Sequence, residues 1–139
     1  MSATETIAGL DDLKAKIRTA AERATAKAAQ VIVKNTQANA PVRTGALRAS
    51  IFADPVTNEG ESFVTEVGPH IVYGRILDMG GVIRGNPWLA WDSELLGRRF
   101  VTKKPVTVPA RGYFRTGVEE SQDEINDIIA QEIARILAD

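Results

Sequence analysis

The side chains that most often carry enzymatic chemistry are nearly missing from this sequence. Among its 139 residues there is no cysteine and a single histidine, His70. The lack of cysteine removes disulfides, thiol nucleophiles and thiolate metal ligands. One histidine alone has no second imidazole with which to bind a metal ion, and we expect no catalytic role for it. The sequence therefore predicts a protein that is not an enzyme and that uses no cofactor or metal.

Other motifs that could do chemistry have simpler explanations. Asp11 and Asp12 look like a paired carboxylate, but near the start of a helix such residues interact favourably with the helix dipole. The glycine-rich run 80–85 lacks the lysine and the glycine spacing of phosphate-binding loops, so we interpret it as a flexible loop. None of the serines lies in the Gly-x-Ser-x-Gly setting of serine hydrolases.

Charge is unevenly distributed, although the 17 basic and 18 acidic side chains nearly cancel. Residues 98–115 contain six basic side chains and no acid, whereas residues 119–139 contain seven acids and one arginine. The basic run, with its aromatic residues, has the composition of a nucleic-acid-binding surface. It equally fits the solvated face of a hairpin, or a basic surface that meets the acidic helix of another copy in a ring. All three interpretations stay open.

The elements that position these residues are expected to form one domain over residues 1–139, because two separate cores in a chain of this length would each be marginal. No apolar run approaches the roughly 18 residues that a membrane-spanning helix needs. The first residues also lack the basic start and apolar stretch of a signal peptide. We therefore expect the chain to stay in the cytoplasm in which it is made and to have no membrane partner.

The first element is predicted to be a long amphipathic helix over residues 6–39, because apolar residues recur there every three or four positions. At ~1.5 Å per residue it would reach roughly 50 Å, so we expect part of it to pack on something outside its own core. Pro41 ends this helix. Within the loop 40–50, Thr44 is expected to cap a short turn that begins at Gly45.

Residues 51–115 are expected to form an antiparallel sheet of about four to five strands with loops. A hairpin is predicted around a turn at 57–60, and the segment 71–81 slightly favours a helical turn. A capping box at 116–119 opens a C-terminal helix over 116–138. The order of elements predicts an α+β fold with this helix packed on one face of the sheet. The strands are expected at 51–56, 62–67, 88–92, 98–102 and 105–108.

Three motifs follow one another along the chain. They are Ala-Pro-x-x-Thr-Gly-x-Leu-x-x-Ser-Ile at 40–51, Tyr-Gly-x-x-x-Asp-x-Gly at 73–80 and Ala-Arg-Gly-Tyr-Phe at 110–114. Their order and spacing resemble the gene-product-ten-like neck or minor tail protein family of HK97-type tailed bacteriophages, over about residues 6–137. The sequence departs from the family pattern with glycine for alanine and aspartate for glutamate in the middle motif. In the late motif Gly112 stands where proline is usual.

The resemblance implies a structural virion protein at the head-tail junction, forming rings or ring-associated subunits around the DNA channel, with no enzymatic activity. Its implied partners are further copies of the chain in a six- or twelve-fold ring, portal or head-connector proteins, and tail terminator or tail tube proteins. DNA would pass through without sequence-specific contact. A tail terminator or head-closure protein is the close alternative. A DNA-binding module that uses the basic hairpin is less favoured, and a small enzyme least.

We expect contacts with neighbouring proteins in three places: the loop 41–48, the basic hairpin 98–104 and the turn 111–115. The candidate interface residues there are Pro41, Arg43, Thr44, Arg48, Arg98, Arg99, Lys103, Lys104, Arg111, Tyr113 and Arg115.

Overall fold

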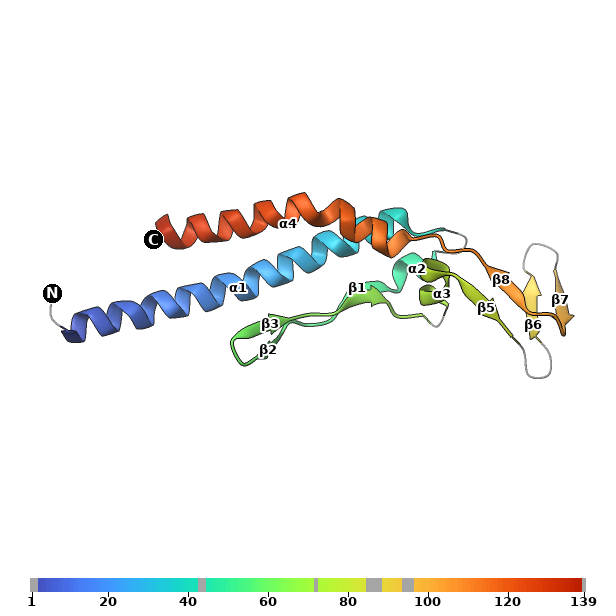
Figure 1. Ribbon diagram of the computed structural model, residues 1–139, viewed down its shortest axis with the longest axis horizontal. Coiled ribbons are helices and arrows are strands. Elements are labelled where there is room, and N and C mark those ends of the chain that lie inside the picture. Colours follow the sequence, from blue (N-terminus) through green and yellow to red (C-terminus); the bar gives the residue numbers. More distant parts are fainter. Residues whose placement is uncertain (1–2, 43–44, 72, 85–88, 94–96, 139) are drawn as a thin grey trace. The chain divides into compact units, whose positions relative to one another are not determined.

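The computed structural model describes residues 3–42, 45–71, 73–84, 89–93 and 97–138. It has an α+β fold, with a long helix near each end of the chain and short strands between them (Figure 1), which confirms the predicted class. The chain divides into two compact units: unit 1 is Met1–His70 with Tyr113–Asp139, and unit 2 is Ile71–Gly112. The expectation of one domain over 1–139 stays a prediction.

Unit 1 is built on two long helices that lie side by side (Figure 1). Helix α1 spans Ala3–Asn39 and confirms the helix predicted over 6–39. Helix α4 spans Tyr113–Ala138. The C-terminal helix was expected on one face of a sheet, but its main partner is α1, so that part of the prediction is wrong. The alanine-rich surface of α1 explains the difference, since small side chains allow a second helix to approach closely.

The two helices run antiparallel, as their polar contacts show. Near the end of α1, Asn35 Nδ2 donates a hydrogen bond of 2.8 Å to Ser121 Oγ, early in α4. Nearer the start of α1, Arg23 Nε donates one of 2.8 Å to Glu132 Oε2, late in α4. An antiparallel arrangement places the dipole of each helix favourably against that of the other.

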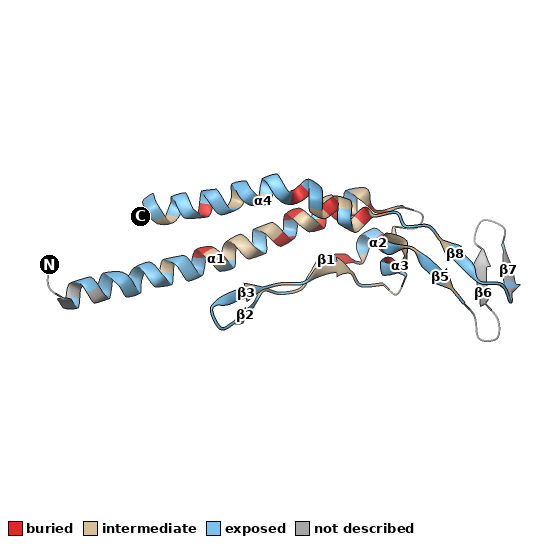
Figure 2. Cartoon of the chain, in the orientation of Figure 1, coloured by how far each residue is buried: buried red, intermediate tan, exposed pale blue. Residues whose placement is uncertain are grey.

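The core of unit 1 lies where α1 packs against α4 and the first strand (Figure 2). Most of its apolar residues are small, so the helices pack closely and the core is slim. Three polar side chains are buried among them. The buried residues are Ala20, Ala29, Val31, Val33, Thr36, Ala40, Leu47, Ile51, Tyr113, Gly117, Ser121 and Glu132.

The helices come closest where Gly117 of α4 crosses Thr36 of α1. A Cβ atom added to Gly117 would lie 2.5 Å from Thr36 Oγ1 and 2.7 Å from Thr36 Cα. Real Cβ atoms essentially never come so near to backbone. Thr36 is 0% exposed, and its hydroxyl has no hydrogen-bond partner within the described structure. Only glycine fits at position 117 without moving one helix away from the other.

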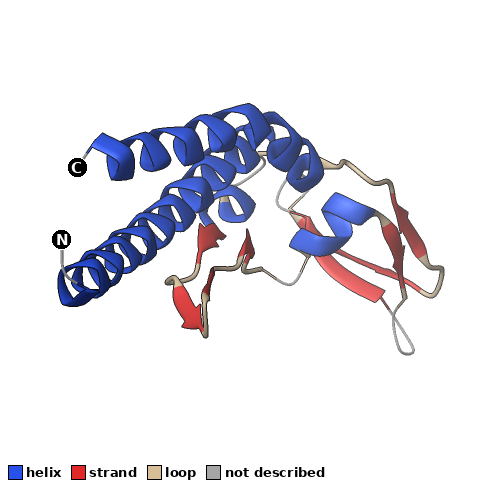
Figure 3. Ribbon diagram, turned by 60° about the vertical axis from the view of Figure 1, so that its left-hand side comes forward, coloured by secondary structure: helices blue, strands red, loops and turns tan. Residues whose placement is uncertain are grey.

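The strands of the described residues form four separate two-stranded antiparallel ladders (Figure 3), not the single sheet of four to five strands that was predicted. Each strand is only three to five residues long. Prolines follow or interrupt several of them, and a proline cannot donate to a ladder. Short, interrupted strands offer too little continuous backbone for a wider sheet.

Two of the ladders form one long hairpin in unit 1. Strand β1 (Ile51–Ala53) pairs with β4 (Val67–Pro69), and β2 (Thr57–Glu59) pairs with β3 (Ser62–Val64). An antiparallel hairpin in this region was predicted, and it is present. The ladders also hold the hairpin against α1, which contacts β1, β3 and β4.

The turn of this hairpin lies later than predicted. Residues 57–59, expected in the turn, are strand β2, and the chain reverses next to Gly60, whose φ is 66°. Between the two ladders the three residues 54–56 face the two residues 65–66, so the first strand carries a β-bulge. Pro55 lies in this bulge, where its missing N–H costs no ladder hydrogen bond.

Unit 2 has one short helix and two ladders. Helix α3 spans Gly74–Met79 and confirms the helical turn favoured for 71–81. Among the residues of this unit whose burial is described, only Gly74 is buried. Strands β6 (Leu89–Ser93), β7 (Arg98–Thr102) and β8 (Val106–Val108) lie at the predicted places, and β6 pairs with β7. Strand β5 (Gly81–Ile83), which pairs with β8, lies in the run 80–85 that was interpreted as a flexible loop, so that interpretation is wrong for residues 81–83.

Two helix starts differ from the prediction. Helix α2 (Ala46–Ala49) has Gly45, at φ 82°, as its N-cap without a side-chain cap, and Thr44 lies outside the described residues. Helix α4 begins at Tyr113, so Thr116 lies inside the helix and no capping box opens it. Gly112, at φ 62°, allows the sharp change of direction just before α4. Burial of Tyr113, which is 1% exposed, fixes the start of the helix.

The crossing at Gly117 gives a first prediction. Gly117→Ala should lower the free energy of unfolding by about 1–3 kcal/mol, because the added methyl group forces the helices apart. Urea denaturation measures the change. Gly9→Ala is the matched control in an exposed helix turn where a Cβ meets nothing within 4 Å, and it should be neutral or slightly stabilising. Equal midpoints for wild type and Gly117→Ala would contradict the crossing.

Candidate assembly surfaces

The single histidine, His70, contacts residues in and next to strand β1. Its ring stacks on Phe52 with the ring centroids 3.5 Å apart, and its Nε2 is 3.4 Å from Asp54 Oδ1. Its Nδ1 lies 3.0 Å from the carbonyl oxygen of Ser50, and because a carbonyl only accepts, Nδ1 carries the proton of that bond. The hydrogen bond from Nδ1 joins the end of β4 to the residue before β1, and Nε2 pairs with Asp54 when the imidazole is protonated.

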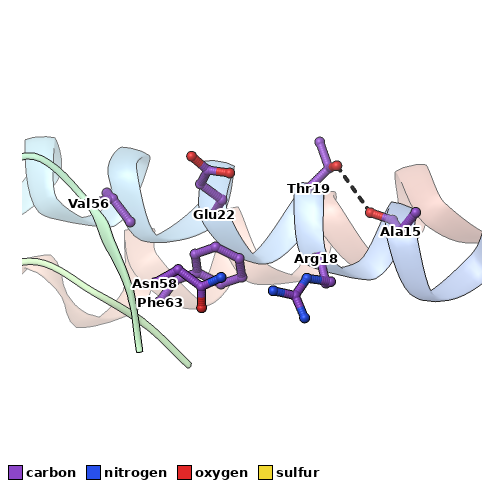
Figure 4. Close-up of a pocket in the computed structure, with 7 residues that line it drawn as sticks. All are labelled: Ala15, Arg18, Thr19, Glu22, Val56, Asn58 and Phe63. Carbon is purple, nitrogen blue, oxygen red and sulfur yellow. Dashed lines mark hydrogen bonds between the residues drawn. The ribbon is translucent and has the colours of Figure 1, made fainter. Parts of the chain in front are cut away.

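A hollow of about 400 Å³ lies between α1 and the β2–β3 ladder of unit 1 (Figure 4). The guanidinium of Arg18 lies over the ring of Phe63, 6.0 Å from its centroid, and Thr19 Oγ1 donates to the carbonyl of Ala15. Glu22 is the one carboxylate in the lining. Within the described residues no three His, Cys, Asp or Glu side chains gather as metal ligands would.

The middle and late sequence motifs meet in unit 2. The backbone N–H of Arg111 donates to the carbonyl of Leu77 at 3.0 Å, and that of Gly112 donates to the carbonyl of Asp78 at 3.0 Å. A Cβ on Gly80 would lie 2.8 Å from the nitrogen of Ala110. The glycine at the end of the middle motif therefore permits a close contact between two chain segments, which is a structural reason for its place in the motif.

In the loop 41–48, the structure describes two of the four candidate interface residues, Pro41 and Arg48. Pro41 is half-buried directly after the first helix. The exposed Arg48 donates from Nε to the carbonyl of Gln37 at 3.0 Å, while Gln37 Nε2 donates back to the carbonyls of Arg48 and Ile51. This exchange ties α2 to the end of α1. Arg43 and Thr44 lie outside the described residues.

The basic hairpin is real, and its described basic side chains are exposed. Arg98 and Arg99 lie on β7, opposite Ser93 and Asp92 of β6. Arg99, Lys103 and Lys104 are exposed, and the side chain of Arg98 is outside the described part. This hairpin can present positive charge to another molecule.

The late turn separates into surface and core residues. Arg111 and Arg115 are exposed. Tyr113 was proposed with them as an interface residue, but it is 1% exposed and belongs to the core. Its large ring anchors the first turn of α4, and the chain itself already covers the surface that a partner would contact.

Opposite charges hold α1 and α4 together from inside. The carboxylate of Glu132, with its side chain 5% exposed, lies 2.8 Å from both Arg23 Nη2 and Lys27 Nζ. The hydrogen bond from Lys27, helped by that from Arg23 and by both charges, lowers the pKa of Glu132 below its usual value of 4.5, against the opposing effect of burial. Arg135 Nη1, on the same helix, is a third cationic partner at 3.9 Å. A buried carboxylate paired with two cations of the other helix fixes the register of the helix pair.

Two rows of apolar side chains on the same helices are exposed. We call Leu10, Leu13 and Ile17 the α1 stripe, and Ile129, Ile133 and Leu137 the α4 stripe. The exposed fractions are 43–60% in the α1 stripe and 45–80% in the α4 stripe. The length of the first helix predicted that part of it packs outside its own core. The sequence periodicity could not show which apolar positions are left uncovered, because that depends on where the helices end relative to each other.

Comparison with models of protein families matches residues 4–80 to a family described as "Bacteriophage HK97-gp10, putative tail-component". The matched segment is more than half of the 139 residues and contains the motifs at 40–51 and 73–80. The chain belongs to the HK97 gp10-like family. Comparison with curated proteins finds no match, and comparison with solved structures finds none either.

Membership of the HK97 gp10-like family confirms the resemblance seen in the sequence and indicates a component of the bacteriophage tail, hence of the virion. The match runs from α1 to α3 and does not include the basic hairpin or α4. No helix in the described part of the chain is both long enough and apolar enough to cross a membrane.

The buried ion pairs give a second prediction. Glu132→Gln should lower the free energy of unfolding at pH 7, because Arg23 and Lys27 lose their buried counter-charge. The folded-state pKa of Glu132 is depressed, so its contribution is fully present above pH 4.5 and is lost as the pH falls below that value through the folded pKa. The gap between wild type and variant should therefore close on acidification.

Urea denaturation at a series of pH values from neutral to acid measures this gap. Glu124→Gln is the matched control, since Glu124 pairs with Lys34 at 3.3 Å on the surface of the same two helices and both side chains are at least half exposed. Its effect should be small at every pH. A constant difference between wild type and Glu132→Gln down to acid pH would contradict the proposed origin of the stability.

Proposed function

We propose that the chain is a structural protein of the phage head-tail junction that assembles as a ring around the DNA channel and has no catalytic activity. The family match over residues 4–80 carries this proposal, because it makes the chain a tail component. The order of the three motifs supports the location at the head-tail junction, because it resembles that of neck and minor tail proteins in particular.

Exposed apolar surface supports an assembly role over a catalytic one. Monomeric soluble proteins rarely leave rows of large apolar residues on adjacent helix turns uncovered. Both the α1 stripe and the α4 stripe are of this kind. The hollow between α1 and the β2–β3 ladder, by contrast, has Glu22 as the one acid and Arg18 as the one base among the residues that line it. A protein with this surface gains free energy by binding other proteins.

The segregation of charge supports contact between copies. Acidic residues of α4, such as Glu119, Glu120 and Asp123, are exposed, and so are the described basic side chains of the hairpin. Complementary patches on one subunit steer copies into head-to-tail contact, and such contacts close into a ring when the rotation between neighbours permits. DNA passing through the ring needs no specific contact with bases.

The junction role gives a third prediction. In the genome that carries this gene, the change Gln30→stop should yield filled heads and separate tails that do not join, because the part between them is missing. Electron microscopy of the lysate measures the fraction of joined particles. Supplying the wild-type chain in trans is the control and should restore joining.

Other outcomes of the same experiment decide against the junction role. Joined particles in normal yield would contradict it. Tails of irregular length would favour a tail terminator, because a tube without its terminator has no fixed end. Heads that have lost their DNA would favour a head-closure protein.

The basic hairpin gives a fourth prediction. Reversing charge with Arg98→Glu and Arg99→Glu should shift the purified chain from oligomer to smaller species, and added salt should have the same effect on wild type. Sedimentation velocity measures the distribution. Arg75→Glu, at an exposed arginine of α3, is the control and should leave it unchanged.

An unchanged distribution in the double variant would remove the hairpin from the interface. A wild-type chain that remains monomeric and binds duplex DNA, with an affinity that falls steeply with salt, would favour the DNA-binding module instead.

A further inference from the structure

The first half of α1 extends past the end of α4. The last turns of α4, at Arg135 and Ile136, lie against Ala15 and Thr19 of α1. The α1 residues from Ala3 to Ala15 therefore continue for about 18 Å beyond this contact, as the blue end of α1 shows in Figure 1. Leu10 and Leu13 lie on this extension, and Ile17 lies at its base.

The α1 stripe borders a shallow hollow of about 300 Å³. Its lining consists of the three stripe residues together with Lys14, Arg18 and Glu61. An occupant of this hollow must be apolar along its centre. The two cations Lys14 and Arg18 outnumber the one carboxylate, Glu61, so the net positive charge favours acidic groups on the occupant. A helix with an apolar row and neighbouring acids meets both requirements.

Helix α4 of the same chain has these properties. The α4 stripe consists of residues four apart, which face nearly the same way on a helix. It is about 12 Å long, and the α1 stripe is about 10 Å long. Asp123 and Asp127 are exposed on the turns just before it. The two stripes are therefore similar in length, and the charges beside one stripe are opposite in sign to those beside the other.

The α4 stripe cannot fill the hollow of its own chain, because α4 of that chain is already packed on α1 with Glu132 held at Arg23 and Lys27. A second copy can supply it. Two different patches on one subunit that fit each other make a head-to-tail contact, which repeats from copy to copy. A two-fold contact would instead require one patch to fit itself.

We propose that the α4 stripe of one copy packs antiparallel on the α1 stripe of the next and forms the apolar part of the contact between subunits, beside the charged part proposed for the basic hairpin. This places Ile133 of one copy near Leu13 of its neighbour, and Ile129 near Ile17. Asp123 and Asp127 then lie beside the basic part of α1 that follows Ile17, as Glu124 lies beside Lys34 within one chain. The inference rests on the proposed ring-forming function and identifies two surfaces through which the copies would contact each other.

Cysteine cross-linking tests the contact directly, because the chain has no cysteine of its own. Leu13→Cys and Ile133→Cys, each at an exposed position, are purified separately, mixed and oxidised with copper phenanthroline. Only facing residues meet the narrow distance limits of a disulfide. The mixture should give a disulfide-linked dimer, whereas each variant alone should remain uncross-linked. Met79→Cys mixed with Ile133→Cys is the control and should give no dimer.

A second measurement uses charge in place of cysteine. Leu13→Glu and Ile133→Glu should each weaken the association of the purified chain at least about tenfold, because each buries a charge in the contact. Met79→Glu, at a residue 64% exposed in unit 2, should not. Thermal melts of the variants should equal that of wild type, since all three positions are exposed within one chain.

The outcomes separate this contact from the function itself. Dimers from Leu13→Cys alone would show a two-fold contact and overturn the inference. The same follows if the mixture gives no dimer, or if the glutamate variants associate as wild type does, even where Gln30→stop still blocks head-tail joining. In that case the junction function stands and a different surface forms the oligomer. A wild-type chain that never associates overturns the contact as well.

Discussion

The pairing of α1 with α4 is the constraint on which unit 1 depends. Two features fix it: the crossing at Gly117, where the helices have no room for a side chain, and the buried carboxylate of Glu132 between Arg23 and Lys27. The first sets the distance between the helices and the second sets their register along each other. Because α4 ends level with Ala15, the same register leaves the first turns of α1 without a covering helix.

Much of this architecture could be predicted from sequence. The period of apolar residues identified α1 and most of α4, and the runs of β-branched residues identified most strands but not β2 or β5. The hairpin after α2 could be predicted, but the pairing of β5 with β8 could not. The bulge at Pro55 moves the turn to Gly60, and the separate ladders arise because short strands interrupted by proline and glycine do not build a wider sheet. Such pairings depend on tertiary contacts that no local pattern encodes.

The candidate interface residues stay a prediction, apart from one that the chain itself buries. Charge pointed to the basic hairpin and the late turn, but Tyr113 in that turn is a core residue. The apolar stripes escaped notice because in the sequence they look like the buried faces of two helices. The exposure of Leu10 and Leu13 follows from the different lengths of α1 and α4 and from the register that Glu132 imposes. The α4 stripe is exposed because its residues lie on a different side of α4 from Ser121 and Glu132, which contact α1. In the proposed contact, the uncovered turns of α1 in one copy are covered by the α4 stripe of the next.

The central claim is that this chain works by occupying a place between other virion proteins. Cryo-electron microscopy of particles produced from its own genome tests that claim most directly. The account predicts a ring of copies at the head-tail junction, with the first half of α1 covered by the last turns of α4 from the adjacent copy. Density for the chain elsewhere in the particle, or particles without it, would contradict the account.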